Sequence, residues 1–199
     1  MNPRQLIIFV KAPRVGAVKT RLAESIGAEA ACAAYRQMAG VLVTQLSGER
    51  EVLLRFTPDD AGLEIQPWLR SGWRCSPQEA GDLGERLKRA FDDAFGEGAT
   101  RVVIIGSDCP AITSDDIVAA RQALETHDLV LGPARDGGYW LVGLRESQPA
   151  LFDEMIWSTS TVLRDTLDRA RRPGLQTHLR RELMDVDSAA EWQEFLASR

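Results

Sequence analysis

Short, unbroken apolar runs alternate along the chain with longer segments in which apolar residues recur at helical spacing. Runs bounded by glycine, proline or charged residues are typical of strands buried on both faces of a sheet. The predicted strands span 6–10, 51–56, 73–75, 102–105, 128–133, 139–142 and 176–183. The predicted helices span 28–46, 63–69, 83–95, 114–125 and 162–170, and a last helix follows residue 188. This alternation predicts an α/β fold with a mostly parallel central sheet that helices cover on both faces.

The central apolar run, Val102–Ile105, ends in a turn that carries Asp108 and Pro110. Ligands of open α/β sheets bind just beyond the carboxyl ends of such strands, where Asp108 lies. Aspartate also serves as an ordinary turn residue. The segment alone supports a functional and a structural reading of Asp108 equally.

A basic loop follows the first predicted strand. It holds four cations around one proline and one glycine: Lys11, Pro13, Arg14, Gly16, Lys19 and Arg21. A strand, a glycine-containing basic loop and a helix start together favour phosphate binding. Neither the spacing of a Walker A loop nor a GxGxxG fingerprint is present. The competing interpretation is a solvated basic loop.

Four further segments carry candidate catalytic, binding or helix-capping residues. Asp82 and Glu85 have the spacing of a capping box, as do Ser188 and Glu191. Asp136 follows another predicted strand, where a ligand would lie. The hydroxyls of 158–161 are predicted to cap the helix that follows, and the capping roles leave Asp185 and Asp187 unexplained.

Composition narrows the range of functions. The 199 residues are enough for one domain with a real core, and the formal net charge of −5 argues against a nucleic-acid partner. The three scattered cysteines and two histidines show no metal-site spacing and fit a reducing compartment. The sequence shows neither a signal-peptide pattern nor a membrane-spanning apolar stretch, so we expect a cytoplasmic protein without a membrane partner.

Several of these segments, in order along the chain, resemble one known family. The matching segments are the basic loop 11–22, Gln78 to Arg86, Gly106-Ser-Asp-Cys-Pro110, Gly132 to Trp140, Trp157-Ser158 and Asp185-Val-Asp187. They are similar to the DUF2064 family, also called the radical-SAM/selenodomain-associated transferase 1 group. The resemblance implies a single domain over 1–199 with the GT-A fold of nucleotide-diphospho-sugar transferases, a three-layer sandwich.

The resemblance also implies roles for individual residues. Nucleotide phosphates would bind the loop residues Lys11, Pro13, Gly16, Lys19 and Arg21, with Gln78 and Arg86 nearby. A divalent metal, Mg²⁺ or Mn²⁺, would be held by Asp108 and Asp187, with Asp185 as the alternative second ligand. Hard oxygen ligands suit both ions.

The implied activity is a metal-dependent glycosyltransferase that uses a nucleotide-diphospho-sugar and a small-molecule acceptor, with Asp136 orienting or deprotonating the acceptor. The alternative is a nucleotidyltransferase that joins an NTP to a phosphorylated acceptor, with Lys19 and Arg21 stabilising phosphate charge. Glycosyltransferases of this fold often carry Asp-x-Asp, whereas Ser107-Asp108-Cys109-Pro110 resembles the nucleotidyltransferases more closely. A third hypothesis is a non-catalytic nucleotide-sensing module. Homo-oligomer formation stays open.

Overall fold

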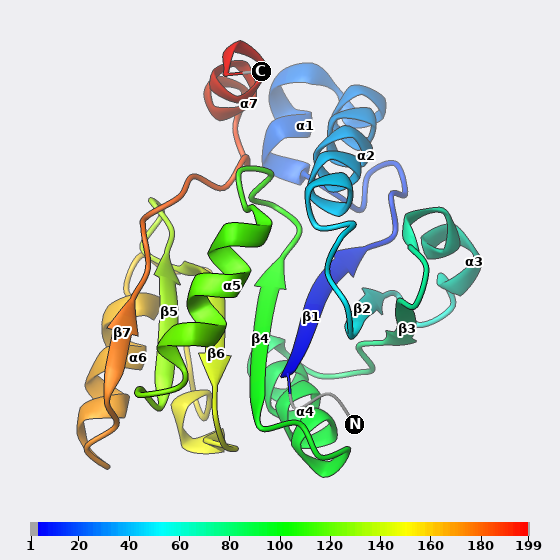
Figure 1. The fold of residues 1–199 in the computed structure, drawn as a ribbon. Helices are drawn as coiled ribbons and strands as arrows, with labels where there is room; N and C mark the ends of the chain where they lie inside the picture. Colours follow the sequence, from blue (N-terminus) through cyan, green and yellow to red (C-terminus); the bar gives the residue numbers. More distant parts are fainter. Residues whose placement is uncertain (1–3, 199) are drawn as a thin grey trace.

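A single seven-stranded sheet forms the centre of the computed structural model, which describes residues 4–198. The strand order is β3-β2-β1-β4-β6-β5-β7 (Figure 1). The strands are β1 (Arg4–Lys11), β2 (Val52–Thr57), β3 (Arg74–Pro77), β4 (Arg101–Gly106), β5 (Leu129–Pro133), β6 (Tyr139–Leu144) and β7 (Thr177–Leu179). The predicted α/β fold with one central sheet is confirmed.

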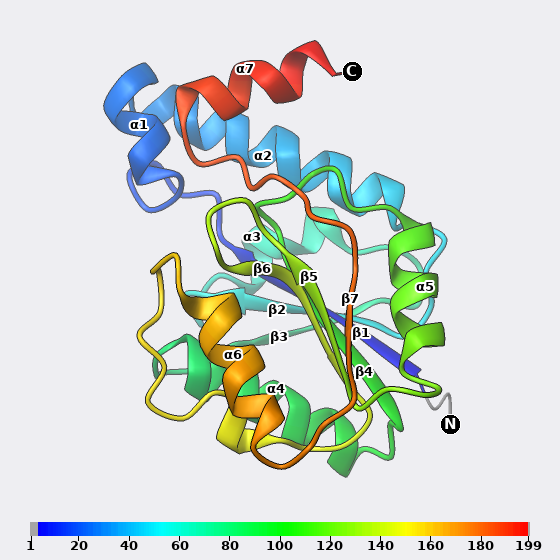
Figure 2. The same cartoon turned by 90° about the vertical axis from the view of Figure 1, so that its left-hand side faces the viewer.

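Helices cover both faces of this sheet. They are α1 (Thr20–Ile26), α2 (Ala28–Gln45), α3 (Gly62–Ile65), α4 (Leu83–Gly96), α5 (Ser114–Ala123), α6 (Val162–Arg171) and α7 (Ala189–Ala197), with 3₁₀ turns η1 (Gln66–Trp68) and η2 (Pro149–Leu151). In the interior of β1, successive side chains point to opposite faces. Leu6 and Ile8 belong to the core that α2 and α5 cover, whereas Ile7 belongs to the core that α4 and α6 cover. These two pairs of helices lie on opposite faces of the sheet (Figure 2). The three-layer sandwich follows from this alternation.

The direction of the strands brings several loops to one edge of the sheet. β1 pairs in parallel with β2 and β4, and β5 with β7, whereas β6 is antiparallel to both β4 and β5. The carboxyl ends of β1 and β4 therefore lie at the same edge as the amino end of β6. This edge carries the basic loop, the Asp108 turn and the Asp136 loop.

A small helical layer stands beyond that edge. α1 and α7 lie beside the amino-terminal half of α2, away from the sheet (Figures 1 and 2). Their contact is apolar: Phe195 of α7 and Val186 pack with Cys32 and Tyr35 of α2. The carboxyl-terminal segment is thereby folded back over the sheet edge.

Two local predictions were wrong in detail. The predicted strand 176–183 is regular only to Leu179: the chain stays beside β5, where the backbone N–H groups of Arg180 and Leu183 donate to Leu131 and Pro133, but the ladder is interrupted between them. In this interruption the Arg181 guanidinium binds the buried Asp116 carboxylate through two contacts of 2.7 and 2.6 Å. At α6, Thr161 is the N-cap without a side-chain cap bond, and its hydroxyl instead donates to Asp165. The predicted capping boxes of α4 and α7 are confirmed. Within residues 4–198, no helix has both the length and the apolar character needed to cross a membrane.

Candidate functional site

A cavity of about 660 Å³ opens at the edge where these loops meet. Its wall comes from the ends of β1, β4 and β6, from the starts of α1 and α4, and from the segments 157–159 and 185–187. Most of the predicted site residues line it: Lys11, Lys19, Arg21, Gln78, Arg86, Asp108, Asp136, Asp185 and Asp187. The fold thus brings predicted site residues that are far apart in the sequence into the wall of one cavity.

The carboxyl-terminal segment is fastened directly to the Asp108 turn. The backbone N–H of Val186 donates to the carbonyl oxygen of Asp108 at 3.0 Å, and the Val186 side chain is buried against α2 and α7. The neighbouring Asp185 and Asp187 both line the cavity. The Asp-Val-Asp pattern therefore uses its apolar residue as an anchor and presents two carboxylates beside Asp108.

Lys19 lies between two of these carboxylates. Its ammonium nitrogen is 2.5 Å from Asp108 Oδ1 and 2.8 Å from Asp187 Oδ1. The Lys19 side chain is 3% exposed, whereas those of Asp108 and Asp187 are 45% and 40% exposed. Burial disfavours the charged lysine, but the two carboxylates outweigh burial and raise the pKa of Lys19. The lysine is therefore held as a buried cation.

Asp185 is the most perturbed acid of the cavity. Burial, followed by the negative charges of Asp108, Asp136 and Asp187, raises the pKa of the Asp185 carboxyl to about 7, and Lys19 only partly opposes this. Acids that crowd a cavity in this way are common at functional sites. Around Asp185, the negative charge of the neighbouring carboxylates exceeds what Lys19 compensates.

The chemistry of these donors fits a hard divalent cation. Carboxylate oxygens are the ligands that Mg²⁺ and Mn²⁺ prefer, and a cation would relieve the crowding of negative charge around Asp185. Among residues 4–198, no group of three or more His, Cys, Asp and Glu side chains is already arranged to hold a metal ion. The carboxylates suit a divalent cation by their chemistry and their charge, and Lys19 lies between two of them, Asp108 and Asp187.

Gln78 and Arg86 form a second polar group in the cavity wall. The Gln78 amide is buried and donates to the carbonyl oxygens of Val10 and Arg55 at 3.2 and 2.9 Å. Its Oε1 accepts from Arg86 at 3.3 Å, and Arg86 also donates to the Gly81 carbonyl. Gln78 thus links β1, β2 and α4, and it orients Arg86 along the cavity.

Part of the basic loop lies outside the cavity lining. The Pro13 carbonyl accepts from Cys32 and Arg36 of α2, while the Arg14 guanidinium binds Asp60 and Glu64 near α3. Gly16 has a φ of 80°, which favours glycine in this turn. Neither Pro13 nor Gly16 is among the residues that line the cavity. Their predicted contact with nucleotide stays a prediction, and they shape the loop that carries Lys19.

The Asp136 loop packs against the segment between η2 and α6. Asp136 accepts a hydrogen bond from the Gly138 N–H at 2.9 Å. The Gly137 N–H donates to the Ala134 carbonyl, and the Gly137 carbonyl accepts from the Leu163 N–H. Gly137 approaches the Ser160 carbonyl so closely that an added Cβ would lie 2.2 Å from its oxygen. The position of Asp136 therefore depends on the neighbouring segment.

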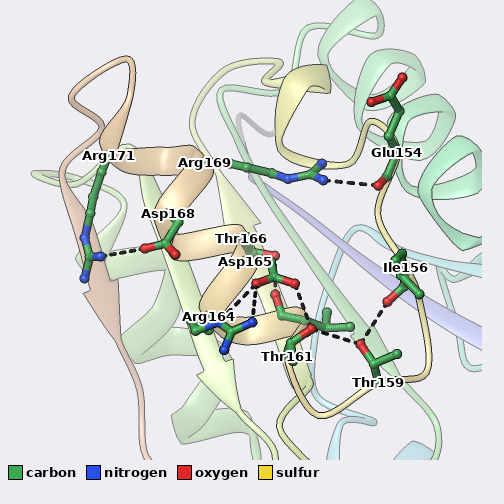
Figure 3. A network of polar contacts seen from close by, with 11 residues as sticks. Glu154, Ile156, Thr159, Thr161, Arg164, Asp165, Thr166, Asp168, Arg169 and Arg171 are labelled. Carbon is green, nitrogen blue, oxygen red and sulfur yellow. Dashed lines mark hydrogen bonds and ion pairs between the residues drawn. The ribbon is translucent and has the colours of Figure 1, made fainter.

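That segment is tied to α6 by the polar network in Figure 3. The Arg169 guanidinium donates to the backbone carbonyls of Asp153 and Glu154, and Thr159 Oγ1 donates to the Ile156 carbonyl at 3.0 Å. Thr161 donates to Asp165 at 2.7 Å. These bonds hold Trp157, Ser158 and Thr159, which line the cavity.

Tyr35 is a site residue that the sequence did not reveal. Its buried hydroxyl accepts from the backbone N–H of Lys11 at 2.8 Å and lies 2.8 Å from Ser107 Oγ. It thereby joins the end of β1 to the end of β4, next to Asp108. In the sequence, Tyr35 has the spacing of an ordinary core residue on the buried face of a helix. No sequence pattern therefore indicated that its hydroxyl joins two strand ends.

Two proteins of substantial sequence similarity match nearly the whole chain. A crystal structure from Desulfovibrio desulfuricans G20, provisionally assigned as a nucleotide-diphospho-sugar transferase, is 34% identical with a TM-score of 0.88, over 94% of this chain and 84% of that one. The phosphoenolpyruvate guanylyltransferase of Sphaerobacter thermophilus is 27% identical over 94% of this chain and 91% of its own length. These similarities support the predicted enzyme class, a transferase.

A more distant structure shares the fold. Rv0371c from Mycobacterium tuberculosis H37Rv, solved in complex with manganese, has a TM-score of 0.55 at 16% identity, with both chains covered completely.

The family described as an uncharacterized protein conserved in bacteria, DUF2064, matches residues 41–159, which is more than half of the chain. The protein therefore belongs to the DUF2064 family and has the GT-A-like nucleotide-diphospho-sugar transferase fold.

Proposed function

We propose that this protein is a nucleotidyltransferase that joins an NTP to a phosphorylated small-molecule acceptor and releases pyrophosphate. The observation that carries the proposal is the position of Lys19, Asp108 and Asp187 together in a cavity that other cations also line. Carboxylates alone would repel nucleotide phosphates, and cations alone would leave a metal without ligands. The combination suits a metal–triphosphate complex.

The cations have complementary roles in this proposal. Lys11 and Arg21 are exposed at the cavity, so their charged groups are free to meet phosphate oxygens. Lys19 supplies a point charge, and Arg21 a planar fork suited to phosphate. Charge that grows on the departing pyrophosphate would be stabilised by these groups, as a fixed cationic site stabilises a developing anion.

Asp108 and Asp187 would hold Mg²⁺ or Mn²⁺, and Asp185 is the alternative to Asp187 as the second ligand. When bound, the ion would neutralise the phosphates of the nucleotide and so assist the departure of pyrophosphate. The manganese complex of the structurally related mycobacterial protein supports Mn²⁺ as the ion to test first.

The transfer step needs little acid–base chemistry. A phosphate oxygen of the acceptor attacks the α-phosphorus of the NTP, the new P–O bond forms, and the bond to the β-phosphate oxygen breaks as pyrophosphate leaves. Because such an acceptor oxygen is already deprotonated, Asp136 would orient the acceptor and would not need to remove a proton. The 27% identity to a phosphoenolpyruvate guanylyltransferase supports this class of acceptor.

Sugar transfer is the second candidate, because the 34% identical relative is provisionally assigned as a nucleotide-diphospho-sugar transferase. In that reaction a neutral hydroxyl would attack the sugar, and a general base becomes important. Asp136 is the carboxylate available for that role, although it already accepts a hydrogen bond from the Gly138 N–H. A cytoplasmic location suits either reaction, since both use nucleotide substrates.

The two candidates release different products. The test incubates the protein and Mn²⁺ with GTP and phosphoenolpyruvate, then with the other NTPs and phosphorylated acceptors, and in parallel with NDP-sugars and hydroxyl acceptors. Nucleotidyl transfer predicts pyrophosphate formed in proportion to acceptor consumed. NDP released from an NDP-sugar, without pyrophosphate from any NTP, would contradict it and support sugar transfer.

A further inference from the structure

The Lys19 ammonium occupies the space between the two predicted metal ligands. It contacts the Oδ1 atoms of both Asp108 and Asp187, and its side chain is almost fully buried. Arg21 also lies near Asp187, but its nearest contact is 3.8 Å, to Oδ2, and its side chain is 67% exposed. Lys19 is therefore buried between the two carboxylates, whereas Arg21 lies at their exposed side.

We infer that Lys19 and the divalent cation compete for Asp108 and Asp187, and that the nucleotide relieves the competition by drawing the ammonium onto its phosphates. The inference rests on the proposed function for the identity of both ligands. It adds a defined coupling: nucleotide binding strengthens metal binding through one lysine.

The competition follows from charge and geometry. A divalent ion binds carboxylate oxygens at about 2.0–2.1 Å in the case of Mg²⁺, so it would share oxygen atoms and space with an ammonium at 2.5–2.8 Å. Two cations on the same carboxylates repel each other, and each weakens the binding of the other. Without nucleotide, Lys19 neutralises the carboxylates that the metal needs.

Lys19 also has the means to move its charge. Its backbone is fixed as the N-cap residue of α1, with a φ of 51° and a ψ of 46°, while its four-carbon side chain can rotate. Triphosphate oxygens in the cavity offer an alternative anionic partner. Because coupling between two ligands is reciprocal, bound metal will strengthen nucleotide binding by the same factor.

The first test measures Mn²⁺ binding to nucleotide-free protein, with free Mn²⁺ followed by electron paramagnetic resonance. Lys19→Met removes the charge and keeps an unbranched side chain, so we expect it to bind Mn²⁺ at least tenfold more tightly than wild type. Arg21→Met is the matched control, with the same loss of charge near Asp187, and we expect less than a threefold change. An unchanged or weaker affinity of Lys19→Met, or an equal gain in both variants, would overturn the inference.

The second test measures the coupling. The affinity for an α,β-methylene GTP analogue is determined with and without Mn²⁺ by calorimetry. We expect the ratio of the two affinities to be at least threefold smaller in Lys19→Met than in wild type. Circular dichroism confirms folding, and Lys19→Gln replaces Lys19→Met if the latter unfolds. A ratio that is the same in wild type and in the folded variant would overturn the inference.

These measurements need no acceptor and no turnover. Failure to form pyrophosphate with any acceptor would therefore count against the proposed function, whereas an Mn²⁺ affinity that does not respond to Lys19 would count against the competition.

Discussion

The hydroxyl of Tyr35 lies 2.8 Å from both the backbone nitrogen of Lys11 and the hydroxyl of Ser107, so one buried side chain of α2 joins the ends of β1 and β4. The basic loop begins at the first of these ends, and Asp108 follows the second. The distance between the basic loop, which is predicted to bind phosphate, and Asp108, which is predicted to bind metal, is thus fixed by an uncharged side chain of α2.

Tyr35→Phe tests this link. The change keeps the ring but leaves the Lys11 N–H and the Ser107 hydroxyl without their partner, so we expect a loss of about 1–3 kcal/mol in the free energy of unfolding. We also expect at least threefold weaker binding of GTP with Mn²⁺. Thr44→Ala removes an exposed hydroxyl from the same helix, where it bonds the Gly40 carbonyl, and should leave nucleotide binding unchanged. Equal nucleotide affinity in Tyr35→Phe and wild type would show that Tyr35 only packs.

Gly137 and Gly174 form a matched pair for testing the Asp136 loop. Both have positive φ, 88° and 79°, but an added Cβ at Gly137 meets the Ser160 carbonyl, and at Gly174 it meets nothing within 4 Å. We expect Gly174→Ala to cost about 1–2 kcal/mol from backbone strain. Gly137→Ala should cost about 1–3 kcal/mol more, since the backbone must move. Urea denaturation measures both, and equal costs would contradict the close packing of Gly137 on Ser160.

The raised pKa of Asp185 predicts a pH dependence of stability in metal-free protein. Because its pKa is about 7 when folded and 3.8 ordinarily, the folded state holds the proton more tightly. This contribution to stability is therefore lost as the pH rises from about 4 toward 7. Between pH 5 and pH 8, wild type should lose roughly 2 kcal/mol relative to Asp185→Asn. Unfolding in the presence of a chelator measures this difference, and a difference that does not vary with pH would contradict the burial of Asp185 among like charges.

The sequence located most of the site because buried parallel strands leave a clear pattern. Val102–Ile105 marks a central strand, and residues after such strands meet at one sheet edge, so Lys19 and Asp108 could be placed together. The short connection between β5 and β6 suits only an antiparallel pair, but the position of β6 beside β4 depends on contacts between distant segments and was not foreseen. The bond between Asp108 and Val186 was equally out of reach, because it joins distant segments through the backbone.

Other details depended on tertiary contacts that compete with local preference. The apolar and polar pattern of 176–183 favours a long strand, yet the ladder with β5 is interrupted after Leu179, where Arg181 binds Asp116, and returns only at Leu183. Arg14 belongs to the basic loop by sequence but pairs with Asp60 and Glu64 in the fold. In both cases an ion pair between distant residues, which local sequence does not reveal, accompanies the departure from the expected structure.

Metal-dependent nucleotide binding at Asp108 underlies every step proposed for this site, and calorimetric titration of GTP with and without Mn²⁺ measures it. Wild type should bind GTP at least tenfold more tightly with Mn²⁺, and Asp108→Asn should lose that gain while remaining folded. Asp115→Asn, the same change at an exposed position in the first turn of α5, should behave as wild type. Equal GTP affinity with and without Mn²⁺ in wild type, or an undiminished gain in Asp108→Asn, would show that Asp108 holds no metal beside the nucleotide.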